Sequence, residues 1–349
     1  MIKSRTYLAI PPGTTIKEYL EDLGMTQKEF SFRMDMSEKH ISKLINGEVQ
    51  LTSDVAERLE LVLGVPAKFW NNLEALYREK IAKAKQENEM DNDIVLSKNL
   101  PYNEMAKLGW VNIAKTPVEK VTNLRKFFRV VNLPLIEKSQ LNKIACRRLA
   151  VTEKSDFALI AWANKVKILA DSISTAPINI KRLSEVLPLI REMTNQMPEE
   201  FTQPLKELLA SCGVALVFLQ HLKGSFLQGA TFMSGSKIVL GLTARGDNDD
   251  KFWFSLFHEL AHIILGHLGK AGEIDEQDER SADFWACDIL IPKTDLEEFL
   301  HFNQLTHQTI CAFANNIGVA PGIVVGRLQY DKKIRYSEFN ELKEHYVIA

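Results

Sequence analysis

The sequence predicts a mainly α-helical protein with a small β-sheet, an α+β fold built from more than one domain. Its 349 residues exceed one ordinary core, because a domain takes roughly 150 residues. Apolar residues recur at three- and four-residue steps through most of the chain, which is helical spacing. That period changes after residue 200, where two short runs rich in Val, Ile, Leu and Phe indicate strands.

Short helical patterns near the N-terminus predict a small all-α domain over residues 1–82. The patterns cover residues 16–23, 27–34, 38–45 and 53–63. They are punctuated by four turn residues, Gly24, Asp35, Gly47 and Gly64. Short helices joined by tight turns are typical of such domains. A further helix begins near Pro66, where a first helical turn tolerates proline.

The rest of the chain divides by composition and period. Residues 83–99 are largely polar and are interpreted as a linker. Residues 100–200 are again helical and form a connecting region. In the C-terminal domain, residues 201–349, strands are expected at 214–219 and 237–242, with turn glycines between them. Helices are expected there at 250–267, 279–290 and 306–316.

Composition excludes several classes of protein. The net charge of −2 gives no overall basic field for nucleic acid, although a small reading domain can be locally basic. The four cysteines form no C-x-x-C pair, which argues against a cysteine zinc site and a disulfide framework: Cys146, Cys212, Cys287 and Cys311. No signal-peptide run and no membrane-spanning run occurs, so we expect a cytoplasmic protein without a membrane partner.

The strongest chemical signal is the motif H-E-x-x-H at residues 258–262, which lies in a helical pattern. Residues four apart share one helical face, so His258 and His262 can present ring nitrogens to one metal ion. Glu259 can reach water at that ion as a general base. Apolar residues flank the motif, and a metal would offset the cost of burying its polar groups. Zinc with an open position suits peptide-bond hydrolysis.

A catalytic zinc ion needs a third protein ligand. A third histidine six residues after His262 is missing, because that position is Leu268, and His267 is expected to point elsewhere around the helix. The gluzincin arrangement takes a glutamate from a following helix, and Glu279 supplies one. Asp283, one turn further on, could fix the orientation of a ligand histidine. Two carboxylates in a polar, loop-like stretch compete for the ligand role: Glu273 and Glu276.

Residues 252–292 resemble the ImmA/IrrE family of zinc metallopeptidases. The resemblance rests on FWFSLFHELAHIILGH and ERSADFWACDILIP, and it extends through GVALVF and NNIGVAPGIVVGRLQ. It implies a gluzincin-like domain in which His258, His262 and Glu279 hold Zn²⁺ and Glu259 is the general base. It also implies cleavage of repressor-type regulators.

Two further features of a peptidase site stay open. The strand at 237–242 precedes the motif helix, and an edge strand near the metal commonly holds the substrate backbone in zinc peptidases of this build. This strand is either that edge strand or an ordinary core strand. Three residues are equal candidates to stabilise the oxyanion: Tyr330, His221 and Arg245.

Residues 26–47 show two short helices joined by a turn. Thr26 caps the first helix and forms a capping box with Glu29, and Ser37 caps the second. Apolar residues such as Phe30 and Ile41 can pack inward. Six outward polar side chains can reach phosphates or base edges in a major groove: Gln27, Ser37, Lys39, His40, Ser42 and Lys43.

This segment resembles the XRE type of helix-turn-helix, with its T-Q-x-x-F-S opening and S-x-x-x-I-S-x-x-I-N-G close. Residues 7–80, including PAKFWNNLEALYRE, are similar to HigA-type antitoxins. That family often has glycine at the turn, where Asp35 can adopt a left-handed conformation. The resemblance implies binding to a double-stranded DNA operator. PYNEMAKLGW and LRKFFRV resemble the connecting region of proteins that join a HigA-like domain to an ImmA/IrrE domain.

Charge suggests how the N-terminal domain would bind. Residues 1–90 hold 13 Lys+Arg and 14 Asp+Glu, a net charge of −1, so one copy should bind DNA weakly. We therefore expect a homodimer on a two-fold operator. A helical dimerisation module without DNA binding is the alternative.

Three functions remain open. The first is a DNA-binding regulator whose zinc endopeptidase hydrolyses a repressor or a partner such as a cognate toxin, in a toxin–antitoxin or mobile-element module. The second is a DNA-binding antitoxin or repressor whose zinc domain is structural or a sensor. The third is a housekeeping peptidase whose N-terminal domain serves assembly. Glu259 beside two ligand histidines favours the first, because a structural site would not need it.

Overall fold

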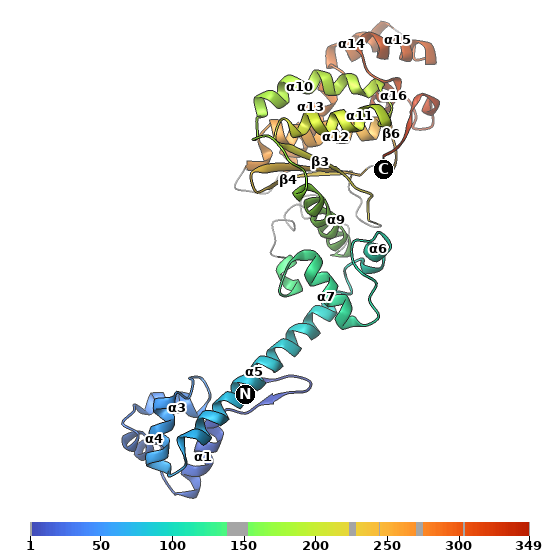
Figure 1. Ribbon diagram of the computed structural model, residues 1–349. Coiled ribbons are helices and arrows are strands. Elements are labelled where there is room, and N and C mark those ends of the chain that lie inside the picture. Colours follow the sequence, from blue (N-terminus) through green and yellow to red (C-terminus); the bar gives the residue numbers. More distant parts are fainter. Residues whose placement is uncertain are drawn as a thin grey trace. The chain divides into compact units, whose positions relative to one another are not determined.

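The computed structural model describes residues 2–137, 153–222, 228–243, 245–269, 275–302 and 304–348 (Figure 1). By internal contacts the chain divides into two compact units, Met1–Leu96 and Ser97–Ala349. Helices dominate both units, and a small three-stranded sheet lies in the second, so the predicted α+β class is confirmed.

The first unit is the predicted bundle of short helices. They are α1 (Pro12–Asp22), α2 (Gln27–Arg33), α3 (Glu38–Ile45) and α4 (Ser53–Leu63). Phe30, Ile41 and Leu59 are fully buried in one cluster, which the indole of Trp70 closes. Asp35 adopts a φ of 52° between α2 and α3, which is the left-handed turn expected there.

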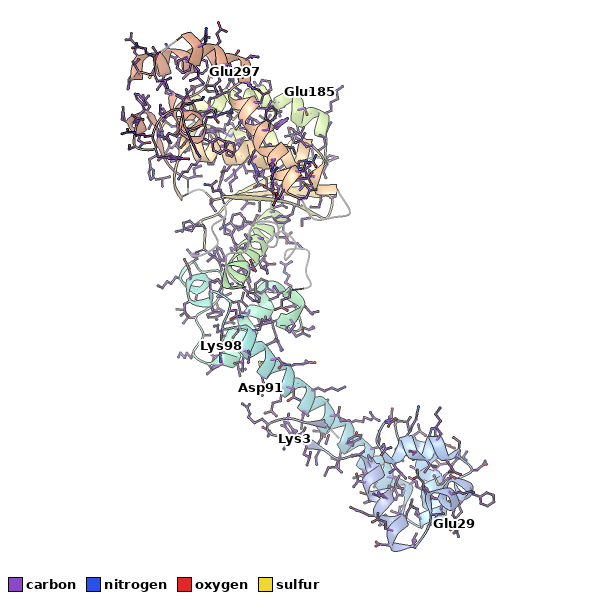
Figure 2. All side chains as sticks on the ribbon, turned by 180° about the vertical axis from the view of Figure 1, so that it is seen from behind. Lys3, Glu29, Asp91, Lys98, Glu185 and Glu297 are labelled. Atoms are coloured by element: carbon purple, nitrogen blue, oxygen red, sulfur yellow. The ribbon has the colours of Figure 1, made fainter. Side chains whose placement is uncertain are left out.

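Helix α5 (Ala67–Leu96) is longer than predicted and includes most of the segment expected as a linker, residues 83–99. A hairpin of β1 (Ile2–Lys3) and β2 (Leu8–Ala9) lies along it, as the position of Lys3 in Figure 2 shows. The Glu87 carboxylate accepts hydrogen bonds from the backbone nitrogen of Thr6 at 2.9 Å and from its hydroxyl at 2.7 Å. The polar side chains of this segment therefore hold the hairpin on a helix.

The second unit contains ten α-helices in the residues that the structure describes. They are α6 (Tyr102–Lys107), α7 (Pro117–Phe128), α9 (Glu153–Asp171), α10 (Ile180–Glu192), α11 (Pro198–Ala210), α12 (Asp249–Ile264), α13 (Glu276–Leu290), α14 (Lys293–Phe302), α15 (His307–Ile317) and α16 (Pro321–Tyr330). Short 3-10 turns connect some of them: η1 (Leu133–Ile136), η2 (Met193–Asn195), η3 (His267–Gly269) and η4 (Asn340–Leu342).

The sheet has the order β3-β5-β4, with β3 (Val214–Phe218), β5 (Lys237–Leu242) and β4 (Gly229–Ser234). β5 pairs in parallel with β3 and antiparallel with β4. The interpretation of residues 237–242 as an edge strand is therefore wrong, because neighbours occupy both sides of β5. β4 was not predicted, because Gly229 and Gly235 indicated turns. A separate pair joins β6 (Arg245–Asn248) to β7 (His345–Val347).

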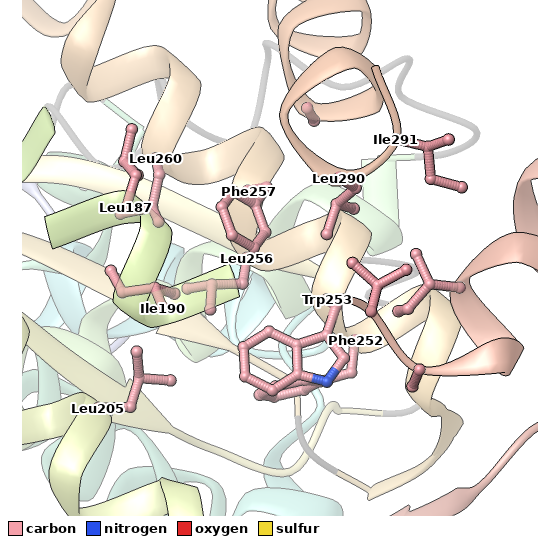
Figure 3. Packing of buried hydrophobic residues seen from close by; sticks show 14 of the residues in the cluster. Leu187, Ile190, Leu205, Phe252, Trp253, Leu256, Phe257, Leu260, Leu290 and Ile291 are labelled. Carbon is pink, nitrogen blue, oxygen red and sulfur yellow. The ribbon is translucent and has the colours of Figure 1, made fainter. Parts of the chain in front are cut away.

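Helices cover both faces of the sheet (Figure 1). α9 packs on one face, where a Cβ atom on Gly241 would lie 2.7 Å from the Trp162 ring. The other face supports the main core, which surrounds α12 and contains Trp253 and Phe257 (Figure 3). Leu187 of α10 belongs to this same cluster. The boundary expected between residues 200 and 201 therefore falls inside one compact unit, because α10 buries its apolar face in that core.

Three of the cysteines lie in the described residues and form no disulfide: Cys212, Cys287 and Cys311. Cys146 lies outside them. Among the described residues, no single helix combines the length and apolar character required to cross a membrane, and α15 and α16 reach that character only as a pair bent by 110°.

Candidate metal centre and candidate nucleic-acid interface

Helix α12 carries the H-E-x-x-H motif into the core of the second unit. Asp249 and Asp250 lie in its first turn, and Lys343 pairs with the Asp250 carboxylate at 2.6 Å. The side chains of His258, Glu259 and His262 are all buried. Polar groups buried to this extent are costly without partners, so their surroundings define the site.

Three side chains from two helices converge at one point. The Nε2 atoms of His258 and His262 lie 3.1 Å apart. The Glu279 carboxylate on α13 lies 3.3 Å from Nε2 of His258 and 3.6 Å from Nε2 of His262. A tetrahedral ion with ligands at roughly 2.0–2.1 Å would separate them by about 3.3 Å. The two ring nitrogens stand near that spacing, and each faces a different oxygen of the Glu279 carboxylate at a similar distance.

The chemistry of these donors also fits a cation. Burial lowers the pKa of His262 to about 4, so its ring is neutral at pH 7 and keeps a lone pair. Two imidazole nitrogens 3.1 Å apart and a carboxylate together present electron pairs to one point. Imidazole and carboxylate are common zinc ligands. The arrangement therefore suits a divalent ion.

A carboxylate contacts the ring nitrogen of His258 that faces away from the other candidate ligands. Asp283 Oδ1 lies 2.8 Å from Nδ1 of His258, the ring nitrogen opposite the donor cluster. Such a partner fixes the tautomer and orientation of a ligand histidine. The structure thus brings Asp283 to the position that the sequence suggested for it.

A strand of the sheet contacts Glu259, the predicted general base. The Thr231 hydroxyl on β4 donates a hydrogen bond of 2.7 Å to Oε2 of Glu259. Gly229 leaves room for this carboxylate, because a Cβ atom there would lie 2.8 Å from Cγ of Glu259. Sequence reasoning missed both residues, because β4 itself was not predicted.

Two other carboxylates, Glu276 and Glu273, were candidates for the third ligand. Glu276 is exposed and pairs with Arg280 at 3.0 Å. Glu273 lies outside the described residues. His267, expected to point elsewhere, returns to the site: its Nδ1 lies 2.9 Å from Nδ1 of His262. That expectation assumed one helix through residue 267, whereas α12 ends at Ile264.

The three oxyanion candidates are placed differently. The Tyr330 ring lies 6.4 Å from the Phe254 ring, which lies 6.2 Å from the His258 ring. Tyr330 and Phe254 also line a cavity of about 590 Å³ beside α12, α13 and α16. His221 is exposed in a loop after β3. The side chain of Arg245 lies outside the described residues.

In the first unit, the predicted DNA-contacting side chains lie on α2, α3 and the turn before α3. Gln27, Ser37, Lys39 and Lys43 are exposed. His40 and Ser42 are half-buried. The Ser37 hydroxyl accepts a hydrogen bond of 3.2 Å from the backbone nitrogen of His40 and caps α3 as predicted.

The capping box predicted for α2 is only half formed. Thr26 accepts a hydrogen bond from the backbone nitrogen of Glu29 at 3.1 Å. The Glu29 carboxylate instead pairs with Arg33 at 2.6 Å, one helical turn further on. An ion pair on the helix surface therefore replaces the return bond that the pattern suggested.

The fold and these two groups of residues indicate a helix-turn-helix domain joined to a domain that carries a candidate metal centre. Family models agree: residues 16–70 match the helix-turn-helix family and residues 222–329 match the IrrE N-terminal-like domain, a peptidase family. The chain belongs to the helix-turn-helix regulators, and residues 222–329 of its second unit match the model of the IrrE N-terminal-like domain.

Two curated relatives are similar to part of this chain. The HTH-type transcriptional regulator YddM of Escherichia coli (strain K12) is 33% identical over 63 residues, which are 18% of this chain and 67% of the relative. Antitoxin HigA-1 of Vibrio cholerae is 40% identical over 57 residues, which are 16% of this chain and 53% of that protein. This chain thus spans about two thirds and about half of the lengths of these two relatives.

Proposed function

We propose that this protein is a DNA-binding transcriptional regulator with a zinc-dependent endopeptidase domain that hydrolyses a repressor or partner protein. The observation that carries the proposal is the convergence of His258, His262 and Glu279 within 4.8 Å, with Glu259 beside them. Structural zinc sites usually have four protein ligands, whereas the described residues supply three. Three ligands and an adjacent carboxylate match a hydrolytic site.

The residues around the site have separate tasks in this proposal. His258, His262 and Glu279 would hold Zn²⁺, which supplies Lewis acidity and makes water acidic enough to lose a proton near neutral pH. Glu259 accepts that proton, and Thr231 holds one oxygen of its carboxylate at 2.7 Å during the transfer. Glu259 then delivers the proton to the amine that leaves the cleaved bond.

The substrate backbone would bind along β4. Thr231 on β4 contacts the general base on α12, so this strand lies directly beside the reacting groups. β4 is also an edge of the described sheet, and an edge strand can accept an extended peptide by strand addition. The cavity lined by Phe254 and Tyr330 would take a substrate side chain. Tyr330 is our candidate for the oxyanion donor.

The first unit would direct this activity to one operon. In this proposal a homodimer places two copies of α3 on a two-fold site in double-stranded DNA. Lys39 and Lys43 would contact phosphates, while Gln27 and Ser42 face the groove. The relative named antitoxin HigA-1 supports a toxin–antitoxin or mobile-element module as the setting.

The test is Glu259→Gln in the full chain, co-expressed with the protein encoded beside it. We expect zinc content to stay unchanged and cleavage of the neighbour to fall by roughly 10²–10⁴-fold, the usual contribution of a general base. Glu276→Gln, an exposed change on α13, is the matched control and should leave cleavage intact.

A second function keeps the metal and lacks the cleavage. In that case the protein is a DNA-binding antitoxin or repressor whose zinc site is structural or a sensor. The specific support is that the two relatives bear the names of a transcriptional regulator and an antitoxin. Regulation in cells that persists unchanged in Glu259→Gln would favour this second function over the first.

A further inference from the structure

The two candidate ligand histidines, His258 and His262, are contacted by different kinds of side chain at Nδ1. Nδ1 of His262 faces Nδ1 of His267 at 2.9 Å, where His258 has a carboxylate. His267 continues to α13: its Nε2 lies 3.4 Å from Asp278 Oδ1 and 3.5 Å from Ser281 Oγ. His267 and Asp278 are both buried, so this row of groups is shielded from water.

The neighbours of His267 fix where its proton lies. The Ser281 hydroxyl donates its hydrogen to the backbone oxygen of Asp278 at 2.8 Å, so toward His267 it can only accept. The Asp278 carboxylate is an acceptor as well. The His267 tautomer with its hydrogen on Nε2 satisfies both neighbours, and in that tautomer the lone pair lies on Nδ1.

This proton placement sets the tautomer of the ligand. Because Nδ1 of His267 accepts, Nδ1 of His262 must donate the hydrogen between them. The lone pair of His262 is then on Nε2, which faces Glu279 and His258. The opposite tautomer would place a hydrogen among the donor atoms and prevent coordination.

We propose that His267 and Asp278 are positioning residues, which hold His262 in the tautomer that binds the metal through a carboxylate–histidine–histidine row. The inference rests on the metal centre of the proposed function. Asp278 has a second task, because its Oδ2 faces the backbone nitrogen of Asp275 in the capping box of α13. The same residue thus holds His267 and begins the helix that carries Glu279.

Two substitutions at one position separate this role from simple packing. Asparagine at position 267 keeps an oxygen acceptor near the place of Nδ1, whereas phenylalanine keeps the ring volume without any acceptor. We expect His267→Phe to raise the zinc dissociation constant by roughly 10–100-fold, the range for lost outer partners of a ligand. We expect His267→Asn to remain within a few-fold of the parent chain, about 3-fold at most.

The measurement is competition for Zn²⁺ with a chromophoric chelator, together with the visible spectrum of the Co²⁺-loaded full chain. His307→Phe, an exposed histidine on α15, is the matched control and should change neither readout. A weaker site in His267→Asn than in His267→Phe would show a packing role and overturn the inference. Zinc affinity unchanged in both variants would overturn it too and leave the proposed function standing.

A variant that does not fold and a parent chain that binds no zinc lead to different conclusions. If His267→Phe does not fold, as circular dichroism would show, Asp278→Asn replaces it, with an expected rise of about 10-fold in the dissociation constant. An unchanged affinity in a folded Asp278→Asn chain would remove Asp278 from the row. A parent chain that binds no zinc at all would refute the metal centre itself, which distinguishes that failure from failure of the row.

Discussion

The predicted DNA-contacting residues and the predicted metal ligands lie in opposite environments. Lys39 and Lys43 are exposed on α3. His258 and His262 are buried on α12, and contacts from two other elements surround them. We therefore expect the α3 lysines to become ordered only when a partner binds, whereas the histidines are already held in place by the fold.

This difference determines how each region should respond to its surroundings. Exposed lysines contribute to DNA affinity through phosphate contacts and counterion release, so their effect falls as salt rises. Buried donors are screened much less by salt. Substitutions in the metal centre should therefore produce large effects that salt does not change, and substitutions on α3 should produce smaller effects that salt controls.

The largest effect is expected from His262→Ala. Removal of a ligand costs more than removal of an outer partner, so the zinc dissociation constant should rise by more than about 100-fold. Zinc content after dialysis and chelator competition, both at low and at high salt, measure the change. The matched control is His307→Ala on the surface of α15. Retention of zinc by the His262→Ala chain would contradict the metal centre.

A buried acid at the start of α12, the helix that carries the two candidate ligand histidines, should make stability depend on pH. Burial raises the pKa of Asp249 from 3.8 to about 7. The native chain therefore keeps a proton between about pH 4 and pH 7 that the unfolded chain has lost. Stability from this group is complete below pH 4 and falls as pH rises to 7, by at most about 4 kcal/mol.

Asp249→Asn tests this dependence, because asparagine resembles the protonated acid and does not titrate. We expect the variant to unfold at higher urea concentration than the parent chain at pH 8 and at a similar concentration near pH 4, with chelator present in both. Asp22→Asn, on the exposed surface of α1, should follow the parent chain. Parallel curves for Asp249→Asn and the parent would show that Asp249 keeps an ordinary pKa.

A moderate effect is expected from Asp283→Asn. Its carboxylate holds Nδ1 of His258 at 2.8 Å, but the side chain is 42% exposed and water can replace part of the contact. The zinc dissociation constant should rise by about 10-fold, the low end for such partners. The same chelator competition applies, with Glu276→Gln as the control on α13. If the zinc dissociation constant rises more in Asp283→Asn than in His267→Phe, Asp283 contributes more to zinc affinity than His267 does, contrary to this prediction.

The smallest effect is expected on the first unit. Lys39→Ala combined with Lys43→Ala should reduce the slope of log affinity against log salt by about 1.8, since each phosphate contact contributes about 0.9. Binding is measured on a duplex that carries the DNA upstream of this gene. Lys17→Ala with Lys68→Ala removes equal charge from α1 and α5 as the control. A slope unchanged in the α3 variant would place these lysines away from DNA.

The sequence predicted those parts of the molecule that depend on local pattern. The short helices of the first unit agree with the residue spacing to within a few residues, because caps and turn residues determine their ends. The ligand pair His258 and His262 follows from helical spacing alone. Glu279 followed from an expected second helix, and the structure brings it to the same point.

What the sequence missed depends on contacts between distant segments. Thr231 is 28 residues from Glu259, and no periodicity connects them. His267 was misplaced because Gly266 has a φ of 74° and turns the chain back toward His262. Residues 83–96 of the predicted linker are helical, and Glu87 there binds the N-terminal hairpin, a contact that no local pattern shows. The division between the two units nevertheless falls within residues 83–99.

The absence of a side chain at Gly229 has a consequence for how homologues could lose the proposed general base. A Cβ atom there would lie 2.8 Å from Cγ and 3.0 Å from Oε1 of Glu259 and 2.9 Å from Cδ2 of Leu242, so its three nearest atoms belong to none of the three candidate ligand side chains. One codon change could therefore displace the base while the ion-binding residues stay in place. A larger residue at this position in a homologue would therefore predict loss of the proposed general base with the proposed metal ligands retained.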